Sequence, residues 1–209
     1  MATSKRTVAR GSIRRRKSGK TSAQVRKRQE GYFISALVLT FVFLITMVLI
    51  FNYLQQRPVG DEREVPSLGN SHVETGQPSP VRYNSTPPTS GPHYGSLTEW
   101  GIYDEPLPYE LVLHNMEDGG VVVYYQCGDG CPDLVAQLTE IVDPAVTAGQ
   151  RVVMMPNDPT ADARSGRKLH EDMGARIALT AWGRIDTFDD FDADRVRSFI
   201  SRYQGIDHH

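Results

Sequence analysis

Residues 32–53 read YFISALVLTFVFLITMVLIFNY and contain no charged side chain. A helix of about 20 apolar residues is long enough to cross the hydrocarbon layer of a membrane, which is about 30 Å thick. Tyr32 and Tyr53 stand at the two ends, where membrane-spanning helices commonly carry aromatic residues. A buried helix of a soluble protein would need a second hydrophobic shell, which the rest of the chain does not supply. We therefore predict a transmembrane helix over residues 31–54.

The segment that precedes this helix is strongly basic. Residues 1–30 carry eleven Lys or Arg and one acid, a net charge of +10, whereas the rest of the chain has twelve Lys or Arg against twenty-four Asp or Glu. Such a segment is typically disordered, and Lys and Arg stay on the cytoplasmic side of a span. We predict a disordered cytoplasmic tail that lies against anionic lipid headgroups. Nucleic-acid binding is the rival role, and the lack of interleaved aromatic residues argues against it.

The apolar run differs from a cleaved signal peptide. It is too long, a long segment precedes it, and no small-x-small cleavage site follows Asn52. We therefore expect a retained signal-anchor, which makes the chain a single-pass protein of the cell membrane with its C-terminal part outside the cytoplasm.

Composition changes again after the apolar run. Residues 55–80 are polar, rich in Pro and Gly, and show no hydrophobic period, so we interpret them as a flexible linker in which His72 is solvated. Residues 81–205 form the predicted extracytoplasmic domain. Its first part, residues 81–108, has too many Pro and Gly for a helix or a central strand, yet it contains several aromatic residues. We expect an ordered loop wrapped over the core.

The remaining pattern predicts an α+β domain, in which two helices cover one face of a mixed or antiparallel sheet of about four strands. The predicted strands are residues 110–114, 121–126, 151–155 and 176–185, and the predicted helices are residues 131–142 and 192–203. The first two strands would form a hairpin, and residues 157–173 a long loop. Asp192 is the expected N-cap of the last helix, and His208 and His209 are expected to fray.

The string YNSTPPTSGPHY at residues 83–94 is distinctive. Together with WGIY at 100–103, HNME at 114–117, GGV at 119–121 and AWGR at 181–184, it resembles the family known as domain of unknown function 3105 over about residues 82–203. The resemblance implies a membrane-anchored or secreted bacterial protein and brings no established activity. Members typically have a second histidine in a His-x-x-x-His-Gly pattern, whereas this chain has Asp118 there, which weakens any site transferred from the family.

Residues with metal-ligating side chains gather near this motif. They are His93, His114, Glu117 and Asp118, whose imidazole nitrogens and carboxylate oxygens are ligands of zinc and copper. His93 lies in the stiffened loop and His114 ends a predicted strand, so the two can converge, and the family pattern pairs these positions. We predict a zinc or copper site formed by His93, His114 and Asp118. Two alternatives stay open, namely hydrogen bonds to backbone carbonyls that tie the loop to the core, and acid/base catalysis.

The two cysteines of the chain are Cys127 and Cys131, and Pro132 follows them. They lie between a predicted strand and a predicted helix, on the oxidising side of the membrane if the topology holds. The order strand, Cys-x-x-x-Cys-Pro, helix resembles the copper-chaperone branch of thioredoxin-like proteins, in which two thiolates and a distant histidine hold copper. A structural disulfide, copper or thiol chemistry, and a pair of free thiols are the three interpretations.

Three functions are compatible with these observations. The first is a membrane-tethered binding module with a metal site, and the second is a thioredoxin-like thiol or copper-transfer protein that uses Cys127 and Cys131. The third is a non-catalytic structural or interaction domain whose aromatic loop docks a protein partner. No phosphate-binding loop, serine nucleophile motif or catalytic carboxylate pair is recognisable, which favours binding over catalysis.

Overall fold

The computed structural model describes residues 22–55, 60–128, 130–163 and 166–209 of the 209-residue chain. The predicted cytoplasmic tail therefore lies outside the described residues as far as residue 21. The chain divides into two compact units, Met1–Gln55 and Gln56–His209, each of which is described by itself.

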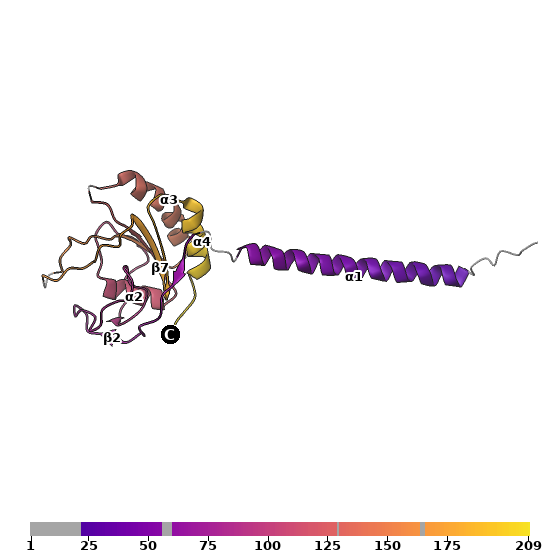
Figure 1. The fold of residues 1–209 in the computed structure, drawn as a ribbon, viewed down its shortest axis with the longest axis horizontal. Helices are drawn as coiled ribbons and strands as arrows, with labels where there is room; N and C mark the ends of the chain where they lie inside the picture. Colours follow the sequence, from indigo (N-terminus) through magenta and orange to yellow (C-terminus); the bar gives the residue numbers. More distant parts are fainter. Residues whose placement is uncertain (1–21, 56–59, 129, 164–165) are drawn as a thin grey trace, which may run out of the picture. The chain divides into compact units, whose positions relative to one another are not determined.

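The first unit contains helix α1 (Ser22–Gln55), which includes the predicted span (Figure 1). Its stretch Tyr32–Leu54 is long and apolar enough to cross a membrane, and every side chain in that stretch is exposed. The hydroxyls of Thr40 and Thr46 donate to backbone carbonyls four residues earlier, at 2.9 and 2.8 Å, so these polar groups are satisfied within the helix. The helix starts earlier than the predicted span, and the expected disorder is therefore wrong for residues 22–30.

In the second unit, the described residues form a mixed sheet of six strands, where about four were predicted. The strands, in sheet order, are β1 (Arg63–Glu64), β8 (Arg184–Phe188), β7 (Ile177–Ala181), β5 (Val121–Tyr125), β6 (Val152–Pro156) and β4 (Gly101–Ile102). Strands β5, β6 and β4 run parallel to one another, and β7 is antiparallel to both β5 and β8. The α+β class and the mixed sheet agree with the sequence analysis.

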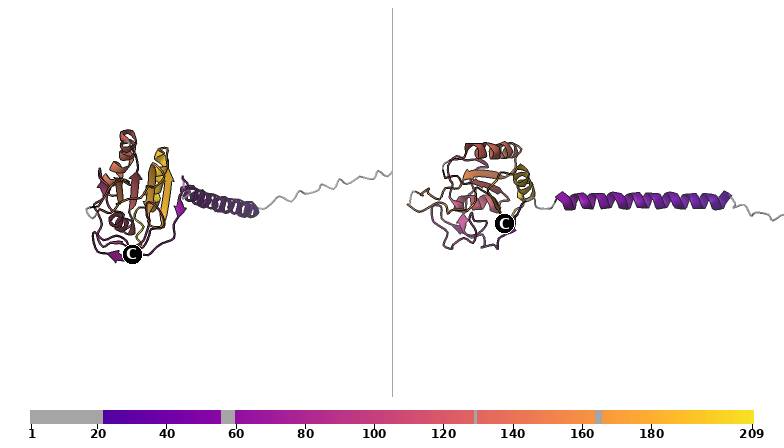
Figure 2. Two further views of the ribbon diagram at one scale, coloured as in Figure 1. Left: turned by 60° about the vertical axis from the view of Figure 1, so that its left-hand side comes forward. Right: turned by 45° about the horizontal axis from the view of Figure 1, so that its top comes forward.

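Helices cover both faces of this sheet (Figures 1 and 2), whereas the sequence analysis expected only one covered face. Helices α3 (Pro132–Thr147) and α4 (Ala193–Tyr203) pack with Val121 and Val123 of β5. Helix α2 (Tyr109–Glu117) packs with Val122 and Tyr124 of the same strand. A strand that is buried on both sides is a continuous apolar run without alternation, as the sequence VVVYY is.

Helix α2 replaces the strand predicted at residues 110–114, so the hairpin predicted with residues 121–126 is also wrong. Val112, Leu113 and Met116 are fully buried, at the spacing of one helix face. The run Leu-Val-Leu at residues 111–113 is short, and a short apolar run is as typical of a strand as of a buried helix.

The strand predicted at residues 176–185 is the first part of a hairpin. Strand β7 ends at Ala181, and β8 begins at Arg184 after a turn at Trp182 and Gly183. Gly183 has φ +69°, a left-handed conformation that glycine adopts at little cost. The other predicted elements are present, since α3, β6 and α4 cover the regions expected, and Asp192 caps α4 by accepting from the backbone N–H groups of residues 194 and 195 at 3.0 Å.

The described part of the predicted linker, residues 60–80, belongs to the folded unit. It contributes β1, which pairs with β8, and β2 (His72–Val73), which pairs in parallel with β3 (His93–Tyr94). Val65 is buried, and its N–H donates to the carbonyl of Gly183 at 2.9 Å. Backbone hydrogen bonds to distant strands order this segment. Amino-acid composition gives no sign of such pairing, and for that reason the segment was predicted to be a flexible linker.

Residues 81–108 form the ordered loop that the sequence analysis expected, and they carry the short strands β3 and β4. Tyr83 and Trp100 pack against the core beside α2, and the hydroxyl of Tyr83 donates to the carbonyl of Pro92 at 2.7 Å. The loop therefore places β3 next to α2, where the candidate site lies.

Candidate functional site

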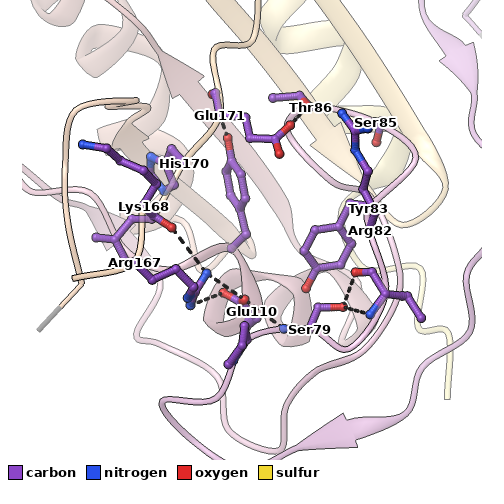
Figure 3. A pocket seen from close by; sticks show the side chains of 14 residues that line it. Ser79, Arg82, Tyr83, Ser85, Thr86, Glu110, Arg167, Lys168, His170 and Glu171 are labelled. Atoms are coloured by element: carbon purple, nitrogen blue, oxygen red, sulfur yellow. Dashed lines mark hydrogen bonds and ion pairs between the residues drawn. The ribbon is translucent and has the colours of Figure 1, made fainter. Parts of the chain in front are cut away.

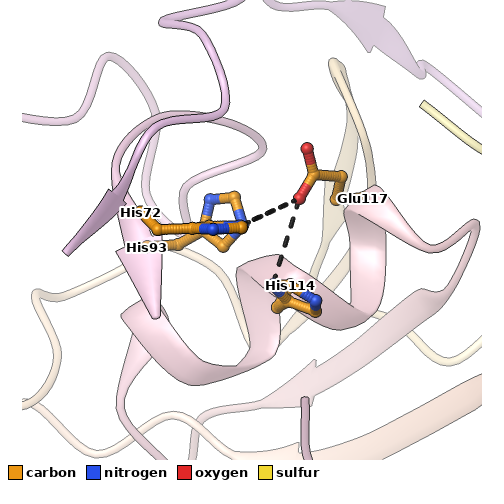
Figure 4. Close-up of side chains that lie close together, drawn as sticks. All are labelled: His72, His93, His114 and Glu117. Carbon is orange, nitrogen blue, oxygen red and sulfur yellow. Dashed lines mark hydrogen bonds and ion pairs between the residues drawn. The ribbon is translucent and has the colours of Figure 1, made fainter. Parts of the chain in front are cut away.

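Four side chains with metal-ligating atoms converge beside α2 (Figure 4), namely His72, His93, His114 and Glu117. We refer to them as the His/Glu cluster. One ligand atom of each lies within 4.8 Å of the others. His72 and His93 are directly opposite in the parallel β2–β3 pair, and His114 and Glu117 are neighbours one turn apart on α2. Three segments that are distant in sequence therefore build the cluster.

Glu117 is the residue that the three histidines share. Its Oε2 lies 3.0 Å from His93 Nε2, 3.6 Å from His72 Nε2 and 4.0 Å from His114 Nδ1. The imidazole ring centroids are 4.9 to 5.2 Å apart. In a tetrahedral zinc site, bonds of about 2.0–2.1 Å set neighbouring ligand atoms about 3.4 Å apart. Small side-chain rotations would bring the cluster to that spacing, so these residues fit a metal ion.

Backbone carbonyls orient two of the histidines. His93 Nδ1 lies 2.8 Å from the carbonyl of Gly91, and His114 Nδ1 lies 2.9 Å from the carbonyl of Tyr94. A carbonyl oxygen only accepts, so each Nδ1 donates its proton and the lone pair that a metal requires is on Nε2, which in His93 is the nitrogen 3.0 Å from Glu117. Metal-ligating histidines are commonly held in this way. The His114 bond also ties the loop to α2, so the structural role and the ligand role are compatible within that residue.

The cluster places a buried carboxylate among imidazole side chains. The side chains of His93 and Glu117 are 0% and 1% exposed, whereas that of His72 is 50% exposed. Burial lowers the pKa of His93, against the opposing influence of its bond to Gly91 and of the Glu117 carboxylate. A buried carboxylate is costly without a counter-charge, and the ion-pair partners of Glu117 among the described residues are all imidazoles. The site is therefore one that a divalent cation would stabilise.

Asp118, the third ligand predicted from the sequence, is not among the four residues of the cluster. Its Oδ1 accepts from His209 Nε2 at 2.5 Å, and this bond raises the pKa of His209. The backbone carbonyl of Asp118 accepts from Arg151. The structure thus brings the predicted His93 and His114 together and places Glu117 and His72 beside them in place of Asp118.

The C-terminal residues, which were expected to fray, dock against the end of α2. The N–H of Gly205 donates to the carbonyl of Gly119 at 2.7 Å, and the N–H of His208 donates to the carbonyl of Glu117 at 2.9 Å. Gly119 has φ +79°, and a Cβ there would lie 2.9 Å from the backbone of Ile206. Glycine at this position lets the tail approach closely and hold the turn that carries Glu117.

Cys127 and Cys131 form a disulfide with a Cα–Cα distance of 5.9 Å. The copper-binding interpretation needs a third ligand, and the one ligand group found among the described residues contains neither cysteine. His170, in the adjacent long loop, uses both ring nitrogens elsewhere, since Nδ1 accepts from the N–H of Asp158 at 3.0 Å and Nε2 donates to the carbonyl of Leu107 at 2.8 Å.

A cavity of about 320 Å³ lies at the other end of α2 (Figure 3). Glu110, which is buried, lies within it and accepts from the N–H of Ser79 at 3.2 Å. Arg167 Nη1 lies 3.2 Å from Glu110 Oε1, so the carboxylate has its counter-charge within the chain. We therefore assign no ligand to this cavity.

His170 lines the same cavity. We expect this residue to make the stability of the fold depend on pH. Burial lowers its pKa in the folded protein, whereas the unfolded chain has the ordinary value of about 6.5. As the pH falls, His170 is therefore protonated in the unfolded chain before it is protonated in the folded protein. The stability contributed by neutral His170 is complete above about pH 6.5 and is lost as the pH falls from there through the lower pKa of the folded state. In urea unfolding of metal-free protein, the wild type should lose more stability between pH 7 and pH 5 than His170→Asn, which keeps an acceptor for Asp158. Equal losses in the two proteins would contradict this assignment.

The fold and the His/Glu cluster define an α+β domain with a three-histidine, one-carboxylate ligand group. Among the described residues of the same chain is one helix that is long and apolar enough to span a membrane. The chain belongs to the family described as protein of unknown function DUF3105, whose model matches residues 72–208. The matched region includes all four cluster residues. Comparison with curated proteins and with solved structures finds no match.

Proposed function

We propose that this protein is a membrane-tethered extracytoplasmic module that binds a divalent transition-metal ion through His72, His93, His114 and Glu117. The convergence of three imidazoles on one buried carboxylate carries the proposal. Three nitrogens and one carboxylate oxygen suit Zn²⁺, and Cu²⁺ is the second choice because imidazole also favours it.

The ligand count favours holding an ion over catalysing a reaction. Four protein ligands close a tetrahedral zinc site, whereas catalytic zinc usually has three and keeps one position for water. His93 and Glu117 are buried, so solvent reaches the cluster chiefly through His72, which is half exposed. His72 is therefore the ligand through which an ion would enter and leave.

The tether and the orientation are supported by α1 and by the charges that precede it. The eleven Lys and Arg before the apolar stretch favour a cytoplasmic N-terminus and contacts with anionic lipid. The disulfide between Cys127 and Cys131 is consistent with a second unit on the oxidising side. In intact cells, an impermeant label should reach an epitope at the C-terminus and spare one at the N-terminus. Labelling of the N-terminus alone would reverse the orientation.

Metal analysis of the full chain in detergent tests the metal site. After incubation with Zn²⁺ and dialysis, the wild type should retain one ion per chain, and His93→Gln should retain none. Asp118→Asn is the matched control, because Asp118 follows Glu117 in the sequence but its carboxylate contacts His209 and is not part of the cluster. Loss of zinc in Asp118→Asn would favour the ligand set predicted from the sequence. If the wild type retains no Zn²⁺ or Cu²⁺, an interaction domain is the function that remains.

A further inference from the structure

The disulfide lies where a parallel β-α-β unit places its reactive groups. Strands β5 and β6 are parallel and are joined by α3, and their carboxyl ends, at Tyr125 and Pro156, both lie beside the start of that helix. In open sheets of this kind, ligands bind in the crevice outside the carboxyl ends of the strands. A cleft of about 400 Å³ lies there, and Cys127 and Cys131 both line it together with Asn157.

The two glycines on either side of residue 129, Gly128 and Gly130, are exposed between the cysteines. Both cysteines are partly exposed. A Cβ added at Gly128 or Gly130 would meet no atom within 4 Å, so the described part of this turn has nothing packed on it. Gly130 has φ +85°, which lets the chain turn tightly enough to join the cysteines. A disulfide that served stability alone would need neither the cleft nor the open turn.

The two sulfurs are not equivalent. Cys131 is the N-cap of α3 and Pro132 begins the helix, so Cys131 is the cysteine adjacent to the unpaired N–H groups of the first turn, and its side chain makes no capping hydrogen bond in the disulfide form. That end of a helix stabilises a thiolate. The described acids nearby are Asp133, which is exposed in the first turn, and Asp158, whose Oδ1 accepts from the N–H and hydroxyl of Thr160. Cys131 is therefore the better leaving group and Cys127 the sulfur to be attacked.

We infer that Cys127 and Cys131 form a thiol–disulfide exchange site that accepts two electrons from a dithiol of a partner protein. A partner thiolate attacks Sγ of Cys127, the Cys127–Cys131 bond breaks, and its electron pair goes to Cys131 as a thiolate. The second partner thiolate then attacks the partner sulfur of the mixed disulfide and releases Cys127. The partner ends as a disulfide, the two cysteines end as thiols, and two protons pass from partner to protein.

The position of the motif supports this inference independently of the metal site. A cysteine pair beside a β-α-β unit is the arrangement of thioredoxin-like redox motifs. The departure here is the spacing, because three residues separate the cysteines where two are usual. Compared with a Cys-x-x-Cys motif, the additional residue places Cys127 one position further from the helix. Cys131 is still the N-cap of α3.

Alkylation of single-cysteine variants tests the inequality of the sulfurs in the full chain. In Cys127→Ser, the rate at which iodoacetamide modifies Cys131 should fall less than about 10-fold between pH 8 and pH 6, because the thiolate persists. In Cys131→Ser, the rate at Cys127 should fall about 100-fold, as for an ordinary thiol. Two equal, steep declines would overturn the assignment. A cooperative urea-unfolding transition shows that each variant is folded.

Glutathione equilibration of the wild type gives a second measurement. A structural bridge resists reduction, whereas an exchange site should become half reduced at a ratio of [GSH]² to [GSSG] at least about 100-fold lower. Quenching with acid should trap glutathione on Cys127 in preference to Cys131, as read by peptide mass. A disulfide that stays intact at high glutathione, or mixed disulfide mainly on Cys131, would overturn the inference.

Discussion

Replacing Glu117 with glutamine is expected to lower the affinity for zinc by at least about 100-fold, because substitutions in the outer shell of metal sites already cost about 10- to 100-fold. The metal-free protein should be as stable as the wild type or more stable, since the variant removes a buried charge whose described ion-pair partners are imidazoles. The two effects have opposite sign. A side chain that mattered only for packing would not produce that combination.

Thermal unfolding with and without zinc measures both effects at once. At a zinc concentration 100 times Kd, the wild type should gain about 2.7 kcal/mol, which corresponds to a rise in Tm of about 5–10 °C for a domain of this size. Glu117→Gln should lose that rise. Glu110→Gln is the matched control, because Glu110 is equally buried on α2 but pairs with Arg167. It should keep the zinc response and unfold at a lower temperature. An unchanged zinc response in Glu117→Gln would refute the ligand set.

Replacing Asp186 with alanine is expected to destabilise the second unit by about 3–5 kcal/mol, the usual cost of removing one partner from a buried ion pair. Asp186 on β8 is 2% exposed and accepts two bonds from Arg195 on α4, at 2.5 and 2.7 Å. The guanidinium also lies over the ring of Phe188, 4.3 Å from its centroid. After the substitution, the Arg195 guanidinium would stay beside the sheet without a counter-charge.

The paired replacement Asp186→Leu with Arg195→Met supplies the contrast. Hydrophobic residues of similar volume often replace a buried pair without loss, so the double variant should lie within about 1 kcal/mol of the wild type. Urea unfolding of the metal-free protein gives both numbers. A single variant that costs less than about 1 kcal/mol would show that the pair is solvated.

The elements with strong local signals were predictable from the sequence. The periodic run after Pro132 predicted α3, the β-branched runs predicted β5 and β6, and Asp192 marked the start of α4. Helix α2 was missed because three of its apolar residues, at positions 111–113, are consecutive, and so short a run is equally typical of a strand. The strands β1 and β2, two residues each, were missed because pairing with distant segments creates them.

Two of the four residues of the candidate site were predicted from the sequence as ligands, and two were not. The family resemblance pointed to His93 and His114, and the structure places their ring centroids 5.2 Å apart. Asp118 was chosen because the family pattern has a histidine at that position, and the strand predicted at residues 110–114 hid the fact that residues 114 and 117 share a helix face. His72 lies in a polar stretch, and only its register opposite His93 reveals its role.

The pairing of His72 with His93 matters for any truncated version of the protein. It would also affect the reactivity of a metal ion bound in the His/Glu cluster. A fragment that begins at residue 81, where composition suggests a boundary, lacks β2 and keeps three of the four ligands. An ion held by three side chains has room for a water molecule, and zinc makes such a water acidic enough to attack other molecules. If the cluster binds zinc as proposed, the loss of these two paired residues would change a closed four-ligand site into a three-ligand site with a position for water.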